Sequence, residues 1–173
     1  MSDWPAFRAE FPVTTRWAFF DHAAVAPLSG PAVRALHEYA ASLAENGIAV
    51  FKTWFDRLQH VRKLAAQLVN APDADDVYFV PNTTHGIGVI AEGFPWHPGD
   101  NVVLAAEEYP ANQYPWMNLA HRVVEVRTVP SRGSRLLLDD IRAAMNDRTR
   151  VLTVSAVEFA SGFRNDLDAL GEL

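Results

Sequence analysis

Two adjacent threonines lie where a short apolar run passes into a helical stretch, in residues 79–86, FVPNTTHG. The free N–H groups and the positive dipole end at a helix start favour a phosphate, and the hydroxyls of Thr83 and Thr84 add donors. Ordinary helix capping accounts for an asparagine or threonine at this place without any ligand. The turn matches neither a Walker loop nor a G-x-G-x-x-G fingerprint, so the sequence does not favour a nucleotide.

A second polar and aromatic cluster, EEYPANQYPW at residues 107–116, directly follows the apolar run at 101–106. Ligands of open α/β sheets bind beyond the carboxyl ends of the strands, and both this cluster and the threonine turn occupy such ends. Tyr109 is suited to stacking on a flat ring. Alternatively, Tyr109 and Trp116 cover the edge of the sheet as core aromatics.

Other reactive side chains are few. His22 stands among small residues in DHAA at 21–24, a setting in which a histidine is more often structural than catalytic. The six histidines lack metal-ligand spacing, so no metal is predicted. The absence of cysteine excludes disulfides and a cysteine nucleophile in this chain. Lys52 and Lys63 are the only lysines and therefore the only candidates for an amine nucleophile.

Alternating strands and helices must position these clusters. Apolar residues at helical spacing predict two long helices, one capped by Ser29 and ending near residue 46 and one over 52–70, and a further helix beginning near Asp166. The other predicted helices are 84–93, 112–120 and 139–145, and the predicted strands are 17–20, 77–80, 101–106, 123–129 and 151–154. This alternation predicts an α/β fold with a mainly parallel sheet covered on both faces.

The composition fits one globular domain, with 173 residues of which 49% are hydrophobic and 21% charged. A net charge of −6 argues against nucleic acid as a partner. No apolar run approaches the length of a membrane span, and the first residues do not resemble a signal peptide. We therefore expect a soluble, cytoplasmic protein without membrane attachment.

Several segments, in order, resemble the class V aminotransferase family of fold-type-I pyridoxal-phosphate enzymes, which includes cysteine desulfurases and isopenicillin-N-epimerase-like proteins. The segments are FDHAA at 20–24, NTTHG at 82–86, PGDNVV at 98–103, EYPAN and PW within 108–116, and VSAVEFASGFR at 154–164. The resemblance runs along nearly the whole chain. It implies a three-layer sandwich, the large domain of a pyridoxal-phosphate-dependent transferase, incomplete at the C-terminus.

The resemblance implies roles for individual residues. Thr83 and Thr84 are expected to hold the phosphate of the cofactor, pyridoxal 5'-phosphate (PLP). Tyr109 falls where relatives place the aromatic residue that stacks on the pyridine ring. His22 and Ala24 are expected on the substrate side.

The sequence departs from the family pattern in two places. Phe159 stands where many relatives have an asparagine near the cofactor hydroxyl, and whether Ser161 replaces that contact is left open. The lysine that forms the Schiff base and the acid that pairs with the pyridine nitrogen follow Leu173 in the family, and neither Lys52 nor Lys63 matches that lysine. The chain alone is therefore expected to contain no catalytic residue and to be inactive.

The resemblance also implies an organisation and partners. Residues 1–20 are expected to form an N-terminal segment, and residues 21–173 the N-terminal part of the large domain. The implied substrate is an amino acid, with desulfurase, epimerase, lyase and transaminase reactions all open. A homodimer, or assembly with a missing C-terminal half, is expected, and the apolar stretch 48–55 supports association. The alternative is a non-catalytic α/β module that serves in binding or assembly.

Overall fold

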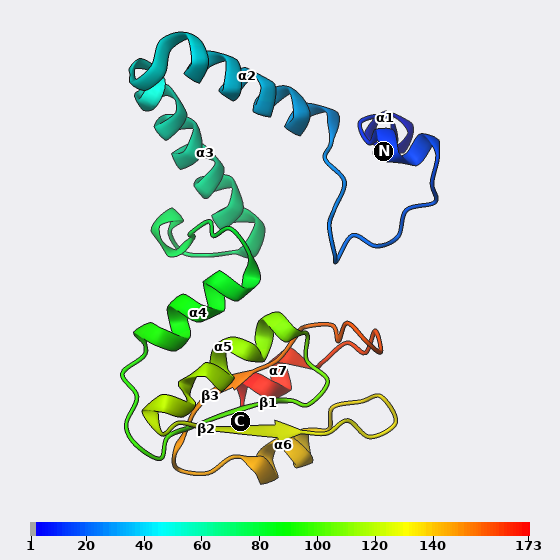
Figure 1. Cartoon of the computed structure of the whole chain (residues 1–173). Helices are drawn as coiled ribbons and strands as arrows, with labels where there is room; N and C mark the ends of the chain where they lie inside the picture. Colours follow the sequence, from blue (N-terminus) through cyan, green and yellow to red (C-terminus); the bar gives the residue numbers. More distant parts are fainter. Residues whose placement is uncertain (1–2) are drawn as a thin grey trace. The chain divides into compact units, whose positions relative to one another are not determined.

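The computed structural model describes residues 3–173. The chain forms two compact units, Met1–Tyr78 and Phe79–Leu173 (Figure 1). This division into compact units does not test the predicted boundary after residue 20, which stays a prediction. No helix within residues 3–173 is both long and apolar enough to cross a membrane.

The first unit is helical. It contains α1 (Trp4–Ala9), α2 (Gly30–Asn46) and α3 (Phe51–Val69), with 3-10 turns at Pro12–Thr15, Gly47–Val50 and Ala74–Asp76. Ser29 caps α2 as predicted, since its hydroxyl accepts from the Ala32 N–H at 3.4 Å. The Trp54 indole of α3 donates to the Ser42 hydroxyl of α2 at 3.0 Å and meets the Tyr39 ring edge-on. Both predicted long helices are confirmed, and they contact each other beside the turn that joins them.

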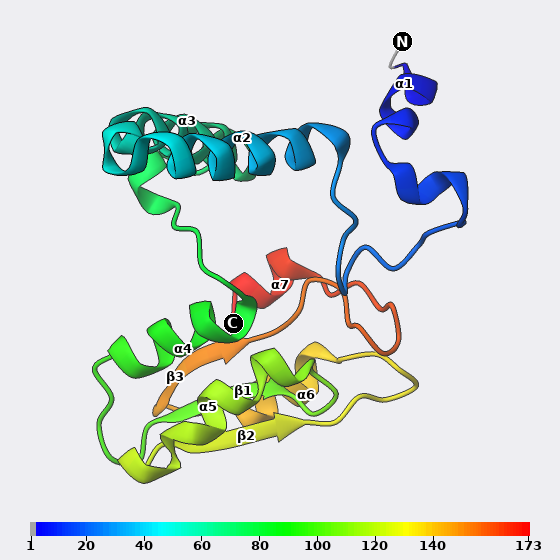
Figure 2. The same cartoon turned by 45° about the horizontal axis from the view of Figure 1, so that its top comes forward.

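The second unit contains a parallel sheet with helices on both sides (Figure 2). The described strands are β1 (Asn101–Ala105), β2 (Glu125–Val129) and β3 (Thr149–Thr153), and the helical segments are α4 (Thr83–Gly93), η4 (Pro110–Asn112), α5 (Tyr114–Met117), η5 (Asn118–Arg122), α6 (Leu138–Ala144) and α7 (Leu167–Gly171). The sheet order is β2-β1-β3, so β1 is central and pairs in parallel with both neighbours. The predicted parallel sheet is confirmed.

Side chains of β1 alternate between two hydrophobic cores. Val102 and Leu104 pack with residues of α4 and α5, whereas Val103 and Ala105 pack with residues of α6 and α7. The two-residue period of an extended strand produces this alternation. All four side chains are buried, so the sheet is covered on both faces. The predicted three-layer α/β sandwich is therefore confirmed.

Two of the predicted strands are wrong. Residues 17–20 and 77–80 pair with no strand in the described part of the chain. Tyr78 and Phe79 are 75% and 54% exposed, so this apolar run is extended backbone outside the sheet. A strand needs a neighbour to satisfy its backbone hydrogen bonds, and an apolar run does not by itself supply one.

The helix predicted over 112–120 is correct only in part. The segment is divided into η4, α5 and η5. Pro115 lies in the first turn of α5, where its missing N–H is not needed, so the α-helix starts there and not at residue 112. Val123, predicted to begin a strand, adopts a left-handed backbone with φ 59°, and β2 starts two residues later.

Candidate functional site

The predicted threonine turn forms the N-terminus of α4. Asn82 caps this helix, since its side-chain oxygen accepts from the His85 N–H at 2.8 Å. The N–H groups and hydroxyls of Thr83 and Thr84 make no hydrogen bond with any residue that the structure describes, and both residues are exposed. Capping therefore accounts for one donor of the helix start. Two N–H groups and two hydroxyls stay available to an anion.

Tyr109 lies between β1 and η4. Its side chain is 55% exposed and its ring meets the Phe159 ring edge-on, with centroids 5.2 Å apart. Trp116, in contrast, is 3% exposed, and its indole donates to the Asn112 side chain at 3.2 Å. Trp116 is thus a core residue, whereas Tyr109 presents its ring at the surface of the second unit.

The threonine turn and the Tyr109 loop belong to segments that pack together. Helix α4 contacts both η4 and α5, and η4 begins directly after Tyr109. Thr84 and His85 line an open hollow of about 510 Å³ together with Tyr114 and Pro115. Tyr109 does not line this hollow, but the threonine turn and the Tyr109 loop adjoin two elements in contact, α4 and η4.

A buried polar network supports the backbone of the Tyr109 loop. Glu108 is 2% exposed, and its carboxylate accepts from the Ser155 N–H, from the Ser155 hydroxyl at 2.7 Å and from the Tyr109 N–H at 3.3 Å. The Thr153 hydroxyl donates to the Asn112 side chain at 2.6 Å. These bonds tie the loop after β1 to β3 and the loop that follows it.

Glu158 and Asn165 extend this network. Asn165 donates to the Ser155 carbonyl at 2.8 Å and to the Glu158 carboxylate at 2.7 Å. Burial raises the pKa of the Glu158 carboxyl, the hydrogen bond from Asn165 opposes this effect, and the charges of Glu108 and Glu107 add to it. Glu158 thus holds a proton more readily than an exposed carboxyl does.

Sequence reasoning missed Glu108, Asn112 and Ser155 as residues that position the site. The signal in the sequence was position, since Glu108 and Ser155 are polar residues that closely follow the apolar run of a strand, and Asn112 lies in the short 3-10 turn after β1. Acidic residues at such places are usually solvated. The burial of Glu108 depends on a partner 47 residues further along the chain, which local patterns do not show.

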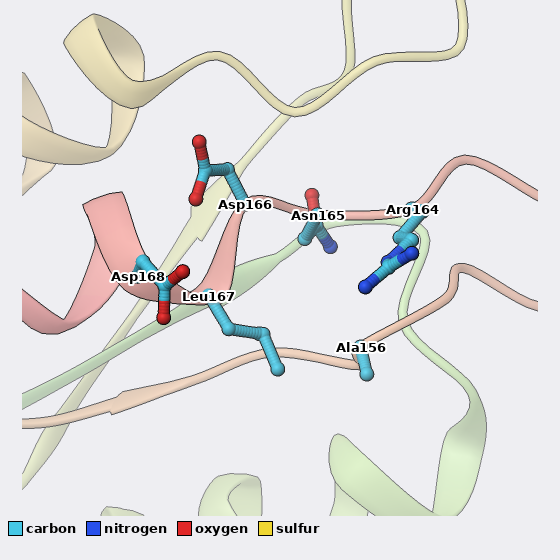
Figure 3. A pocket seen from close by; sticks show the side chains of 6 residues that line it. All are labelled: Ala156, Arg164, Asn165, Asp166, Leu167 and Asp168. Carbon is cyan, nitrogen blue, oxygen red and sulfur yellow. The ribbon is translucent and has the colours of Figure 1, made fainter.

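A second hollow, of about 470 Å³, lies between the loop after β3 and the start of α7 (Figure 3). It is lined by Ala156, Arg164, Asn165, Asp166, Leu167 and Asp168. Asp166 caps α7 by accepting from the Ala169 N–H at 3.1 Å, and its side chain points away from the hollow in Figure 3. None of the residues predicted to bind cofactor or substrate lines this hollow.

His22 and Ala24 belong to the first unit. The His22 ring meets the Phe19 ring edge-on at 5.1 Å, and His22 lines a mainly apolar hollow of about 250 Å³ with Phe7 and Phe11. His22 is nevertheless exposed, and these contacts are with aromatic and apolar side chains. The substrate-side roles of His22 and Ala24 stay predictions.

Phe159 and Ser161 occupy the turn after β3. Phe159 is 58% exposed beside Tyr109. The Ser161 hydroxyl accepts from the Phe163 N–H at 3.2 Å, where Gly162 takes a φ of 70°. Ser161 therefore has a local role in the turn, and its replacement of a cofactor contact is untested.

A family model described as aminotransferase class-V matches residues 18–173. The chain belongs to this family. A cysteine desulfurase of Cronobacter sakazakii is 34% identical over 177 residues, which cover 92% of this chain and 43% of that protein. A probable cysteine desulfurase of Methanothermobacter thermautotrophicus is 29% identical, and the match covers 96% of this chain and 42% of that protein.

Solved structures of the family agree with the fold. The cysteine desulfurase CsdA from Escherichia coli matches with a TM-score of 0.84 and 26% identity over 99% of this chain and 46% of its own. A C-DES variant with glycine covalently linked to its PLP cofactor matches with a TM-score of 0.86 over 95% of this chain and 44% of its own, and at 22% identity it supports the fold alone. The aminotransferase class-V chain thus spans less than half the length of these relatives.

Proposed function

We propose that the chain is the N-terminal part of a PLP-dependent enzyme that acts on an amino acid. The observation that carries this proposal is the contact of α4, whose N-terminus is the threonine turn, with η4, which follows Tyr109. Membership of the aminotransferase class-V family supports it. The PLP held by the C-DES structure supports the choice of cofactor.

The threonine turn fits the phosphate of PLP. The N–H groups and hydroxyls of Thr83 and Thr84 have no other partner in residues 3–173 and are free to donate to phosphate oxygens. The dipole of α4, which is 11 residues long, adds positive potential at the same place. This donor set holds a dianion without a lysine or arginine side chain.

Tyr109 fits the aromatic end of the cofactor. Its exposed ring is suited to stacking on a pyridine ring, while Phe159 contacts it from the side and Glu108 accepts from its backbone N–H. When bound, PLP supplies an electron sink for the bonds at the α-carbon of an amino acid. The residues of this chain bind and orient the cofactor.

Neither lysine of the chain is proposed to bond to the cofactor. Lys52 and Lys63 both lie in α3 of the first unit, and the Lys52 ammonium pairs with the Asp56 carboxylate at 2.6 Å. We expect the covalent lysine outside these 173 residues, so this chain alone binds PLP without turnover. The position of both lysines in α3 also favours the second candidate function, a non-catalytic α/β module that serves in binding or assembly.

The proposed substrate is a small amino acid, and cysteine is the first to test because the relatives are named cysteine desulfurases. Epimerase, lyase and transaminase reactions are the alternatives. The proposed assembly is a cytoplasmic homodimer without nucleic-acid or membrane partners. Exposed apolar residues of α3, such as Phe51 and Leu68 at 62% and 87%, support association, and the net charge of −6 disfavours nucleic acid.

Equilibrium dialysis of PLP against the 173-residue chain tests the cofactor site. Replacing Thr83 and Thr84 together by alanine should weaken binding at least about tenfold, because each charge-assisted hydrogen bond contributes about 1.5–3 kcal/mol. The matched control replaces Thr14 and Thr15, another adjacent pair, by alanine and should bind PLP like the parent chain. Equal affinity in all three chains would leave the turn with a capping role only.

A further inference from the structure

A small cavity lies at the carboxyl ends of the strands, on the side of the sheet that carries Leu136. Its volume is about 120 Å³. Its polar wall consists of Glu107 after β1, Ser131 and Ser134 after β2, and Glu158 and Ser161 after β3. Two carboxyl groups and three hydroxyls therefore converge from three loops, and no basic side chain lines the cavity.

Glu158 is the least satisfied of these groups. Its side chain is 7% exposed, and its Oε1 accepts from Asn165 at 2.7 Å. Its Oε2 is buried and has no hydrogen-bond partner among residues 3–173. A buried carboxylate oxygen without a donor costs free energy that a bound donor recovers.

The cavity wall carries carboxylates and serine hydroxyls but no cationic side chain. The Glu107 carboxylate already accepts from the Ser131 N–H at 3.1 Å, and within the described chain Glu107, Glu108 and Glu158 form no ion pair. The nearby Arg132 guanidinium is engaged by Asp140 at 2.6 Å. A positively charged group is thus the complement that this cavity lacks.

We propose that this cavity is a binding site for a primary ammonium group, with Glu158 as the principal acceptor and Glu107 and the serine hydroxyls around it. An ammonium donates several N–H bonds, which suits carboxylate and hydroxyl oxygens. A metal ion suits the site less well, because residues 3–173 contain no group of three or more His, Asp or Glu side chains able to hold one. The volume limits the ligand to an ammonium with a short alkyl chain.

The lining of this cavity includes none of Thr83, Thr84 and Tyr109, the residues proposed above to hold PLP, and its binding does not require PLP. It is nevertheless adjacent in sequence, because Glu158 precedes Phe159, whose ring contacts Tyr109. Ammonium binding and PLP binding are measured separately, so the failure of one proposal can be told from the failure of the other.

Amide NMR titration of the isotopically labelled 173-residue chain with methylammonium chloride tests this proposal. We expect saturable shifts at residues 131–134 and 158–161. Tetramethylammonium, which has no N–H donor, and potassium at the same ionic strength should not produce them. The absence of saturable methylammonium shifts, or equal shifts with potassium, would overturn the proposal.

Two variants assign the site. Glu158→Gln should weaken methylammonium binding at least about tenfold, because it removes the charge that strengthens the N–H bonds. Glu172→Gln, an exposed matched change, should leave it unaffected. If Glu158→Gln fails to fold, Ser131→Ala tests the assignment instead. We expect Ser131→Ala to bind methylammonium severalfold more weakly than the parent chain. Parent-like binding in the folded Glu158 variant, or in Ser131→Ala when that variant decides, would overturn the assignment.

Discussion

The two units of the chain differ in how far they bury their apolar side chains. Among residues 3–78, Ala66 is the only buried residue, and large side chains such as Leu68 are exposed on α3. The second unit buries Leu104 and Leu119 completely between its layers. The difference shows that an apolar stripe at helical spacing is enough to form a helix, whereas a core requires a second layer to cover the stripe.

The proposed PLP residues follow this division. Thr83 and Tyr109 lie on the unit that has its own core, next to β1 and the helix that packs on it. A rigid layered unit fixes the positions of both residues without help from other parts of the chain. The exposed faces of the first unit instead support the proposed association with a second copy.

The largest expected effect distinguishes the two units directly. Leu104→Ala in the second unit should lower the free energy of unfolding by about 2–5 kcal/mol, because it leaves a cavity in a closed core. Leu68→Ala, the same change at an 87% exposed position, should cost less than about 0.5 kcal/mol. Urea denaturation followed by circular dichroism measures both. A comparable loss in Leu68→Ala would show that the first unit is covered in solution.

The same contrast explains what the sequence could predict. Helical spacing predicted α2 and α3, and apolar runs predicted β1 and β3 to within two residues. The run at 77–80 is also apolar but has no neighbouring strand in the described chain, so pattern alone could not distinguish it from β1. The threonine turn was predictable because its signal is local. The burial of Glu108 was not, because its partner Ser155 is distant in sequence.

A smaller loss of stability is expected at Glu108. Glu108→Gln replaces one carboxylate oxygen by an amide that cannot accept from Ser155, so one buried bond is lost and the free energy of unfolding should fall by about 1–3 kcal/mol. Glu172→Gln is the exposed control. Urea denaturation of both variants at neutral pH compares them. A loss in Glu108→Gln no larger than that of the control would show that this link does not stabilise the second unit.

The smallest expected effects depend on pH and have opposite signs at two glutamates. Burial raises the pKa of Glu158, so its favourable contribution is complete below the ordinary value of 4.5 and is lost as the pH rises through the raised pKa. The hydrogen bond from Arg127 lowers the pKa of the exposed Glu125, whose contribution is present above 4.5 and lost as the pH falls.

Stability measured against pH in two variants checks these signs. Glu158→Gln should gain stability relative to the parent chain as the pH rises above 4.5, whereas Glu125→Gln should lose it as the pH rises toward 4.5 from below. The same sign in both variants would contradict the burial of Glu158.

We propose that the threonine turn and the Tyr109 loop form one PLP site. Amide NMR spectra of the labelled 173-residue chain, recorded with PLP and with inorganic phosphate, test it most directly. Both ligands should shift the amides of Thr83 and Thr84, and PLP alone should also shift those of Tyr109 and Phe159. Shifts confined to other residues, or a Tyr109 response without a response at the threonines, would contradict a shared site.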